Sequence, residues 1–311
     1  MTHVPVMTAE VLQHLRPERG GVFVDCTVGL GGHARALLEA GATRLVGMDR
    51  DRDALARAQA VLAPWAARVE LVHSDYREID EVLDARRIAT VDGALADLGV
   101  SSLQFEASGR GFSFQRDEPL DMRMDQSGGA RAADLLARAS EQEIADAIFR
   151  YGEERFSRRI ARALVEARRE APVDTTGRLA TIVRRAIPRR GFARIDPATR
   201  TFQALRIWVN RELDGLDRFV EAAAKRLRIG ARLAVITFHS LEDRIIKHTL
   251  RALERQAAVV KVLTKKPIIP GDEEVVRNPR ARSAKLRIAE RISATAERAS
   301  VPFGRGVLAH G

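Results

Sequence analysis

The stretch FVDCTVGLGGHA, residues 23–34, has the pattern of a short apolar strand that runs into a glycine-rich turn and then into a helix. Its last six residues, GLGGHA, satisfy G-x-G-x-x-A, a pattern typical of loops that hold a nucleotide-like cofactor at a helix N-terminus. Taken alone the pattern is weak, because glycines after a strand often serve only a tight turn. The surrounding sequence therefore has to decide whether a cofactor binds here, and which one.

Short apolar runs alternate with helical periodicity on both sides of this turn. We expect strands at 22–24, 44–49, 69–73 and 92–99, with helices at 33–41, 53–65 and between the last two strands. Alternation of this kind predicts an α/β fold with a parallel sheet and helices on both of its faces.

This alternation stops near Gly109, and no convincing strand follows until after Thr199. Ser140 and Glu143 form a capping-box pattern at the start of a helix, and residues 154–170 predict another helix. We therefore expect an all-helical insert, rich in arginine, at 109–199. It divides the α/β domain into a first part, 1–108, and a second part, 200–300, which is followed by a tail at 301–311.

The second α/β part is expected to begin with one long amphipathic helix at 201–227, followed by a strand at 231–240. Ser240 with Asp243 has the spacing to cap a helix at 241–256. Two further runs, 259–264 and 284–292, complete the predicted sheet.

Composition indicates a large folded core and an anionic partner. Of the 311 residues 45% are hydrophobic, and the formal net charge is +10. That charge favours a polyanion such as a nucleic acid, although an unspecialised basic surface is the alternative. The single cysteine, Cys26, excludes an internal disulfide and predicts a buried thiol in a reducing compartment. No signal-like or membrane-spanning run is present, so we expect a soluble, cytoplasmic protein without membrane contact.

Three carboxylates at predicted strand ends bear on the choice of cofactor. Asp49 closes the second strand 18 residues after Gly31, where it could bind both hydroxyls of an adenosine ribose or instead cap the next helix. A pyrophosphate of NAD needs free N–H groups, whereas the methionine ammonium of S-adenosylmethionine needs a carboxylate. Asp25 could serve that ammonium, or could merely tie down the loop.

The fourth strand ends in Asp97 and Gly99, at the edge where open α/β sheets hold their ligands. There a carboxylate would meet both a sulfonium donor and a methyl acceptor. No Tyr-x-x-x-Lys pattern that would indicate hydride transfer accompanies it. These features favour S-adenosylmethionine over NAD.

The whole set of motifs resembles one family, the bacterial small-subunit ribosomal RNA cytosine-N4 methyltransferases, also called MraW or RsmH. The resemblance extends from HVPVM near the start to LRIAERI near the end. Its most specific strings are PLDMRMD and FHSLEDR, and it is also carried by VDCTVGLGGHA, MDRD, DLGVSS, RGFSF, YGEERFSRRIAR, ATRTFQALRIWVN and NPRARS.

The resemblance implies a Rossmann-like, S-adenosylmethionine-dependent methyltransferase sheet interrupted by a helical insert, acting on a cytidine in the decoding region of small-subunit rRNA. It implies no metal. Carried over by position, the family's cofactor contacts fall on seven residues: Gly31, Gly32, His33, Asp49, Tyr76, Asp97 and Gln104.

The chemistry of an exocyclic amine assigns roles to two residues. Asp97 is the candidate to accept an N–H hydrogen bond from the cytosine amine, which favours its nucleophilic geometry. His239 could contact the base or relay a proton, or could be satisfied by local backbone. Phe112 and Phe114 could stack on an unpaired base or pack in a core.

The partner expected from the resemblance is small-subunit rRNA, free or in the 30S particle. The insert and residues 278–287 are the expected phosphate contacts. Two alternatives remain at this level: an RNA-binding assembly factor that holds the cofactor without turnover, and a methyltransferase for DNA or protein. The oligomeric state stays open.

Overall fold

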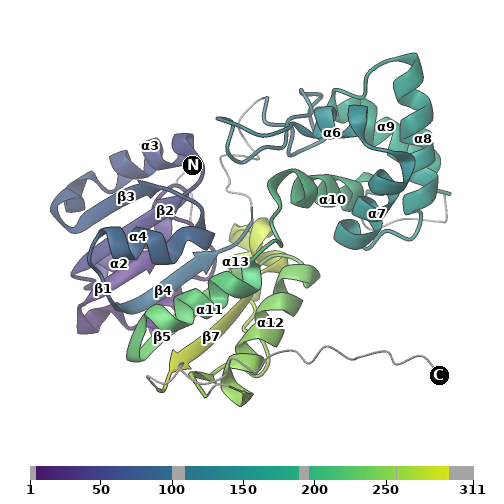
Figure 1. The fold of residues 1–311 in the computed structure, drawn as a ribbon. Coiled ribbons are helices and arrows are strands. Elements are labelled where there is room, and N and C mark those ends of the chain that lie inside the picture. Colours follow the sequence, from purple (N-terminus) through teal and green to yellow (C-terminus); the bar gives the residue numbers. More distant parts are fainter. Residues whose placement is uncertain (1–4, 100–108, 189–195, 257, 294–311) are drawn as a thin grey trace, which may run out of the picture.

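The computed structural model describes residues 5–99, 109–188, 196–256 and 258–293. Figure 1 shows that the chain forms an α/β part and a separate helical part, which lie next to each other. Among the helices described, none combines the length and the apolar character that a bilayer-spanning segment needs.

A mixed sheet is the centre of the α/β part, with the strand order β3-β2-β1-β4-β5-β7-β6. Strands β1 to β5 run parallel to one another, whereas β7 runs antiparallel to both β5 and β6. The strands are β1 (Val22–Asp25), β2 (Arg44–Asp49), β3 (Val69–His73), β4 (Val91–Asp97), β5 (Leu227–Thr237), β6 (Val260–Val262) and β7 (Lys285–Arg291).

Helices cover both faces of the sheet, and this confirms the fold class expected from the sequence. Central strands are apolar on both faces because each face is covered: Leu45, Val46 and Met48 of β2 are fully buried. One face packs against α4 (Ile79–Ala85), α11 (Leu216–Arg226) and α12 (Ser240–Arg255). The other packs against α1 (Thr8–Leu15), α2 (Gly32–Glu39) and α3 (Arg52–Val61).

The order of the strands reverses between β1 and β4. From β1 the chain moves outward through β2 to β3, and then returns to place β4 on the other side of β1. At such a reversal the connections leave in opposite directions, which opens a crevice at the carboxyl ends of the two strands. Asp25 and Asp97 are the last residues of β1 and β4, so both lie at this crevice.

The helical part has its own apolar core, in which Leu136, Ile148, Leu164, Leu179 and Leu205 are buried. Glu143 and Ser140 form the predicted capping box at the start of α7. The helices are α6 (Ala132–Arg138), α7 (Glu141–Gly152), α8 (Ser157–Glu170), α9 (Thr176–Ala186) and α10 (Ala198–Asn210). Because α10 packs on α7, this core reaches past residue 199, the expected end of the insert.

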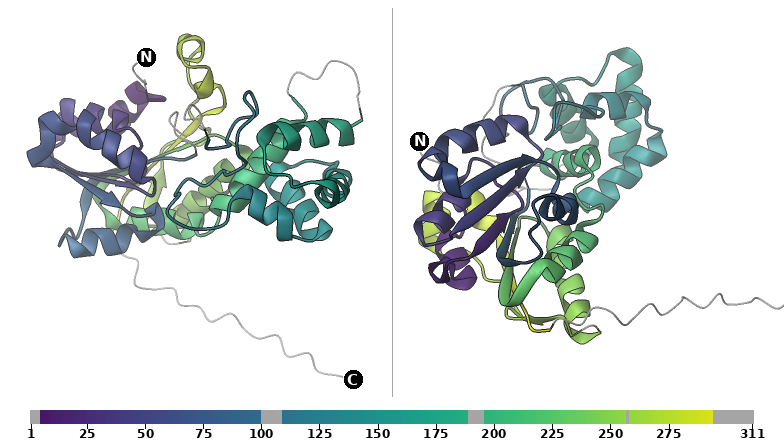
Figure 2. Two further views of the ribbon diagram at one scale, coloured as in Figure 1. Left: turned by 90° about the horizontal axis from the view of Figure 1, so that it is seen from above. Right: turned by 60° about the vertical axis from the view of Figure 1, so that its left-hand side comes forward.

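The prediction of a single long helix at 201–227 is wrong. The chain forms α10 and α11 instead, separated by a turn in which Arg211 and Gly215 have positive φ values of 50° and 69°. The left-handed backbone at Arg211 ends α10, and that at Gly215 lets α11 begin in a different direction. As a result α10 joins the helical core and α11 joins the sheet, as Figure 2 shows from two further directions.

A buried polar cluster joins the two parts near this turn. Asn210 accepts a hydrogen bond from the Met124 N–H (2.7 Å) and donates one to the Met122 carbonyl (2.7 Å). Arg110, which is 5% exposed, donates to Asp51 Oδ2 (3.0 Å) at the start of α3 and to the Met124 carbonyl (2.9 Å). The segment 110–124 is thereby held against both the α/β part and α10.

Candidate active site

The glycine turn forms one wall of the crevice. Gly31 is the N-cap residue of α2 and has a φ of 83°, a conformation that a residue with a side chain rarely adopts. A Cβ on Gly32 would lie 3.0 Å from Pro5 Cγ, so the N-terminal segment packs directly on the turn. The motif therefore needs glycine both for the turn itself and for a close approach.

Asp49, at the end of β2, holds the turn from the side. Its Oδ2 accepts a hydrogen bond from the Gly29 N–H (2.8 Å), and its Oδ1 accepts one from the Asp51 N–H (2.8 Å). Asp51 caps α3 by accepting from the N–H groups of Asp53 and Ala54, so capping is not the task of Asp49. Burial raises the pKa of Asp49, while its two backbone hydrogen bonds oppose that shift.

Tyr76 lines the crevice next to this carboxylate. Its hydroxyl donates to the Glu212 carbonyl (3.0 Å), and its ring packs against Phe219 with centroids 4.8 Å apart. Burial is the main reason that its pKa is raised. The side chain is thus a neutral, immobilised aromatic wall, which is what a flanking contact to adenine requires.

Asp97 lines the crevice and faces His33. Thr27 Oγ1 accepts a hydrogen bond from the Asp97 N–H (2.6 Å), which fixes the end of β4. Asp97 Oδ2 lies 3.4 Å from His33 Nε2. Within the described residues Asp97 Oδ1 is buried and has no hydrogen-bond partner. One oxygen of Asp97 therefore faces histidine, and the other is left for a ligand.

Asp25 lies behind this pair and is 1% exposed. Its Oδ1 accepts a hydrogen bond from the Thr27 N–H (3.2 Å). Asp25 therefore ties down the loop, which is one of the two roles expected for it from the sequence. Its Oδ2 has no hydrogen-bond partner among the described residues. Burial raises the pKa of Asp25 to about 7, and this value is moderated by the nearby His33.

His239 is placed at the start of α12, where its Nδ1 is bound by local backbone and its Nε2 is buried without a hydrogen-bond partner among the described residues. Its Nδ1 accepts from the Glu242 N–H (3.4 Å), and its Nε2 lies 3.1 Å from Glu242 Oε1. Glu242 Oε2 in turn accepts from the N–H groups of Phe238 and His239. The predicted cap by Ser240 is wrong: His239 is the N-cap residue, and Ser240 Oγ donates to Glu153 instead (2.6 Å).

Glu212, His239 and Glu242 also form a compact acidic cluster, with ligating atoms within 4.8 Å of one another. Arg206 donates to both oxygens of Glu212 (2.9 and 2.8 Å). His239 and then Arg206 lower the pKa of Glu242, and they outweigh the effect of its burial. Each acidic side chain of the cluster therefore already has a protein partner.

Two aromatic residues and one amide from the sequence analysis remain. Phe112 is 6% exposed in the helical core, and Phe114 packs edge-on against Phe202 with centroids 4.7 Å apart. Core packing, the alternative to stacking on a base, is therefore what the structure shows for both. Gln104 lies outside the described residues.

Sequence reasoning missed part of the wall of the crevice. Glu212 and Glu242 line it, as do Asn278 and Arg280 from the segment between β6 and β7. The string NPRARS lies in this segment, but the sequence predicts contacts to phosphates there and does not predict that the segment lines the crevice. Glu242 stands three residues after His239, which is the spacing of a capping box.

The crevice fits a cofactor that combines an adenosine with a charged amino-acid chain. Asp49 and Tyr76 are placed for the adenosine, and buried atoms of Asp25, His33 and Asp97 without partners lie at the glycine turn, where the amino-acid chain would extend. At this end of the crevice the polar groups are mainly carboxylates, not the free N–H groups that a phosphate needs. The fold and the crevice together define the class as a Rossmann-like methyltransferase that uses S-adenosylmethionine.

The chain belongs to the MraW methylase family, whose model matches residues 1–292. Three relatives carry the name ribosomal RNA small subunit methyltransferase H. The protein of Sorangium cellulosum is 52% identical over 93% of this chain and 91% of its own length. That of Nitratidesulfovibrio vulgaris (strain DP4) is 50% identical (93% and 95%), and that of Bradyrhizobium diazoefficiens is 47% identical (95% and 93%).

Solved structures are more distant. An rRNA methylase from Streptococcus thermophilus is 12% identical and aligns with a TM-score of 0.42 over 94% of this chain and 99% of its own. A likeness at that level adds nothing to the assignment.

Proposed function

We propose that this protein transfers a methyl group from S-adenosylmethionine to the exocyclic N4 of a cytidine in the decoding region of small-subunit ribosomal RNA. The observation that carries the proposal is Asp97, a partly buried carboxylate at the strand reversal whose buried Oδ1 has no protein partner in the described chain. The relatives named as rRNA methyltransferases support the substrate class. The reaction belongs to the cytoplasm, where ribosomes are assembled.

The cofactor is held, in this proposal, by the residues that the family resemblance assigns. Asp49 accepts from the ribose hydroxyls, Tyr76 flanks the adenine, and Gly31, Gly32 and His33 surround the amino-acid chain. Gln104 completes the assigned set. When bound, S-adenosylmethionine supplies an electrophilic methyl group on a sulfonium.

Asp97 orients the amine that is methylated. The lone pair of a cytosine amine is delocalised into the ring, so the free amine is a poor nucleophile. A carboxylate that accepts one N–H hydrogen bond favours the tetrahedral geometry at nitrogen that methylation requires. The rest of the catalysis is positioning and charge complementarity. His239 contributes by fixing the turn after β5 rather than by contact with the base.

RNA binding is assigned to the helical insert, expected at 109–199, and to residues 278–287. Since N4 is engaged in a Watson–Crick pair in duplex RNA, the target has to be single-stranded or distorted. A net charge of +10 provides the long-range attraction to the phosphates. The substrate is small-subunit rRNA, and the assembled 30S particle is the form we propose.

The substrate is tested by incubating the protein with S-adenosylmethionine labelled in its methyl group and with 30S particles, naked rRNA or duplex DNA. Mass spectrometry of the nucleosides then locates the label. We expect N4-methylcytidine from the small-subunit RNA. Label in DNA or in protein would establish one alternative, and cofactor binding without any transfer would establish the assembly-factor alternative.

The role of Asp97 is tested by Asp97→Ala, which we expect to lower the transfer rate at saturating cofactor by at least about 10³-fold. Calorimetry of cofactor binding separates this loss from weaker binding. Asp92→Asn is the matched control, because Asp92 lies at the other end of the same strand and accepts from the Val22 N–H. Full activity of Asp97→Ala would remove the carboxylate from the mechanism.

A further inference from the structure

His33 has a second feature besides its place in the glycine turn: its imidazole lies directly behind Asp97. It is the second residue of α2 and is 5% exposed. Its Nε2 is 3.4 Å from Asp97 Oδ2, at the end of β4. The two atoms do not form a hydrogen bond of normal geometry in the free protein, but catalytic contacts often tighten when the reacting complex forms.

Carboxylates face His33 from three elements. Asp97 approaches from β4, Asp25 from β1 and Glu274 from α13 (Asp272–Arg277). Glu274 is held in place by the Met7 N–H, which donates to its Oε1 (2.6 Å). Neither ring nitrogen of His33 has a hydrogen bond of normal geometry within the described residues, and the same is true of Asp25 Oδ2. The imidazole is thus buried in a negative environment without a structural bond that would occupy it.

Methylation of the amine releases a proton that has to be accommodated. The nitrogen gains a bond to the methyl carbon, the sulfur–carbon bond of the donor breaks with its electron pair staying on sulfur, and one N–H bond of the resulting ammonium is lost. A base next to the amine can receive that proton. Asp97 accepts the N–H hydrogen bond, but a second acceptor behind it would let Asp97 return to its ionised form.

We propose that His33 is this second acceptor: Asp97 takes up the amine proton, its carboxyl group turns so that the protonated oxygen faces the imidazole, and the proton passes to His33 Nε2. The proposal rests on the proposed function, because it needs an amine substrate at Asp97. Glu274, and Asp25 once it is ionised above pH about 7, then stabilise the imidazolium that forms. His33 therefore works through Asp97, and it does so independently of any contact that its main chain makes with the cofactor.

The electrostatics of the site support this role. Burial alone would lower the pKa of His33, but the carboxylates of Asp97, Asp25 and Glu274 outweigh it and raise that pKa above its ordinary value. The imidazole thus holds a proton more tightly than a free histidine does. It can accept one only when neutral, so methyl transfer should be slow at acid pH and should rise as the pH passes through the pKa of His33.

His33→Gln tests this directly, because glutamine can still donate a hydrogen bond to Asp97 but cannot take up a proton. The single-turnover rate is measured from pH 5.5 to 8.5 with saturating cofactor and 30S substrate. We expect the wild-type rate to rise with pH to a plateau. The rate of His33→Gln should be independent of pH and about 10- to 100-fold below that plateau. His14→Gln, a histidine substitution on α1 outside the crevice, should leave the profile unchanged.

A second measurement does not depend on turnover. The pKa of His33 is followed by NMR in the free protein, and Asp97→Asn should lower it by roughly one unit or more because the facing charge is lost. Asp92→Asn, at the far end of β4, should not change it. A wild-type rate that is flat with pH, a pH-dependent limb that persists in His33→Gln, or a His33 pKa that ignores Asp97→Asn would each overturn the relay. Absence of N4-methylcytidine with the wild-type protein would instead overturn the proposed function.

Discussion

At the scale of single residues, the crevice shows how position alone separates three similar carboxylates. Asp25, Asp49 and Asp97 each end a parallel strand, yet their partners differ. Asp49 has backbone donors on both oxygens, Asp25 has one on a single oxygen, and Asp97 faces an imidazole. Backbone N–H groups stabilise a carboxylate in its ionised form, whereas burial favours the protonated form. Asp25 is the most buried of the three and has a single backbone donor, so it is the one that should affect stability.

Asp25 should make the free protein less stable as the pH rises. Its pKa is raised to about 7 in the fold, whereas an aspartate in an unfolded chain ionises near pH 4. Between these values the folded state keeps a proton that the unfolded state has lost, so the free energy of unfolding falls with rising pH, by up to about 4 kcal/mol. Asp25→Asn removes this loss. Urea unfolding at pH 5 and pH 8 should show the variant gaining stability relative to wild type at the higher pH, and parallel pH dependences would contradict the assignment.

At the scale of elements, the sequence predicted those whose boundaries are set locally. The strands at 44–49 and 69–73 match β2 and β3 because apolar runs end there at polar residues. The break between α10 and α11 was missed, since both helices bury an apolar face and the amphipathic pattern continues across it. The Asp214-Gly215 pair was the local signal, because glycine takes the left-handed conformation that the turn needs.

The residues of the candidate site likewise fall into those that the local sequence predicts and those that it does not. Residues at strand ends could be predicted, because the carboxyl ends of parallel strands meet at one edge. Asn278 and Glu212 could not, because they reach the crevice from a segment between β6 and β7 and from an interhelical turn. These residues reach the crevice only because their segments pack on the sheet, and no local sequence pattern predicts that packing.

The cap of α12 allows a prediction that separates the two roles considered for His239. His239→Ala removes the acceptor for the Glu242 N–H and should lower the free energy of unfolding by about 1 kcal/mol. Asn is a strong N-cap residue, so His239→Asn should keep both the stability and the transfer rate within a few-fold of wild type. Ser240→Ala, whose hydroxyl bonds only at the surface, should cost less than His239→Ala. If His239→Asn retained stability but lost transfer, the imidazole would have a direct part in the reaction.

At the scale of the whole molecule, two bodies with separate cores are joined around one crevice. The turn at Arg211–Gly215 and the segment 110–124 both pass between them, and Asn210 bonds to the second from the end of α10. Tyr76, from the cofactor side, bonds to the backbone of the turn at Glu212. Tyr76, which lines the crevice, and Asn210, which holds the helical part, are therefore bonded to neighbouring segments. These bonds would fix the orientation of RNA bound to the helical part relative to the sheet.

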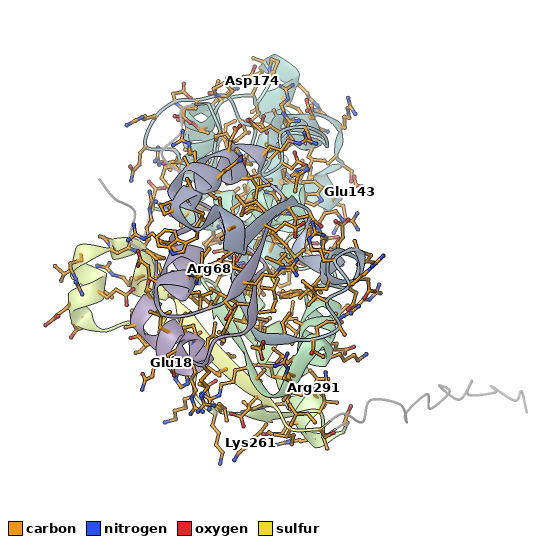
Figure 3. The ribbon with its side chains drawn as sticks, turned by 90° about the vertical axis from the view of Figure 1, so that its left-hand side faces the viewer. Glu18, Arg68, Glu143, Asp174, Lys261 and Arg291 are labelled. Carbon is orange, nitrogen blue, oxygen red and sulfur yellow. The ribbon has the colours of Figure 1, made fainter. Side chains whose placement is uncertain are left out.

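In the view of Figure 3, Asp174 and Glu143 of the helical part lie in the upper half, and Arg291 and Lys261 lie in the lower half. If RNA lies across the crevice, basic residues near it should contribute to binding, whereas equally basic residues at the sheet's far end should not. Arg280 and Arg282 belong to the segment that lines the crevice, and both are exposed. Arg255 and Lys261 are also exposed and lie where α12 ends and β6 begins, away from the carboxyl ends of the parallel strands.

The salt dependence of RNA binding tests this arrangement. Each phosphate contact to single-stranded RNA contributes about −0.7 to the slope of log K against log salt concentration. The double variant Arg280→Ala/Arg282→Ala should therefore make the slope shallower by about 1.4, while Arg255→Ala/Lys261→Ala, with the same loss of charge, should leave it unchanged. Binding is measured by fluorescence anisotropy with a labelled fragment of small-subunit rRNA between 50 and 300 mM salt. Equal changes in both variants would mean that net charge rather than a defined path binds the RNA, and a flat wild-type slope would rule out phosphate contacts altogether.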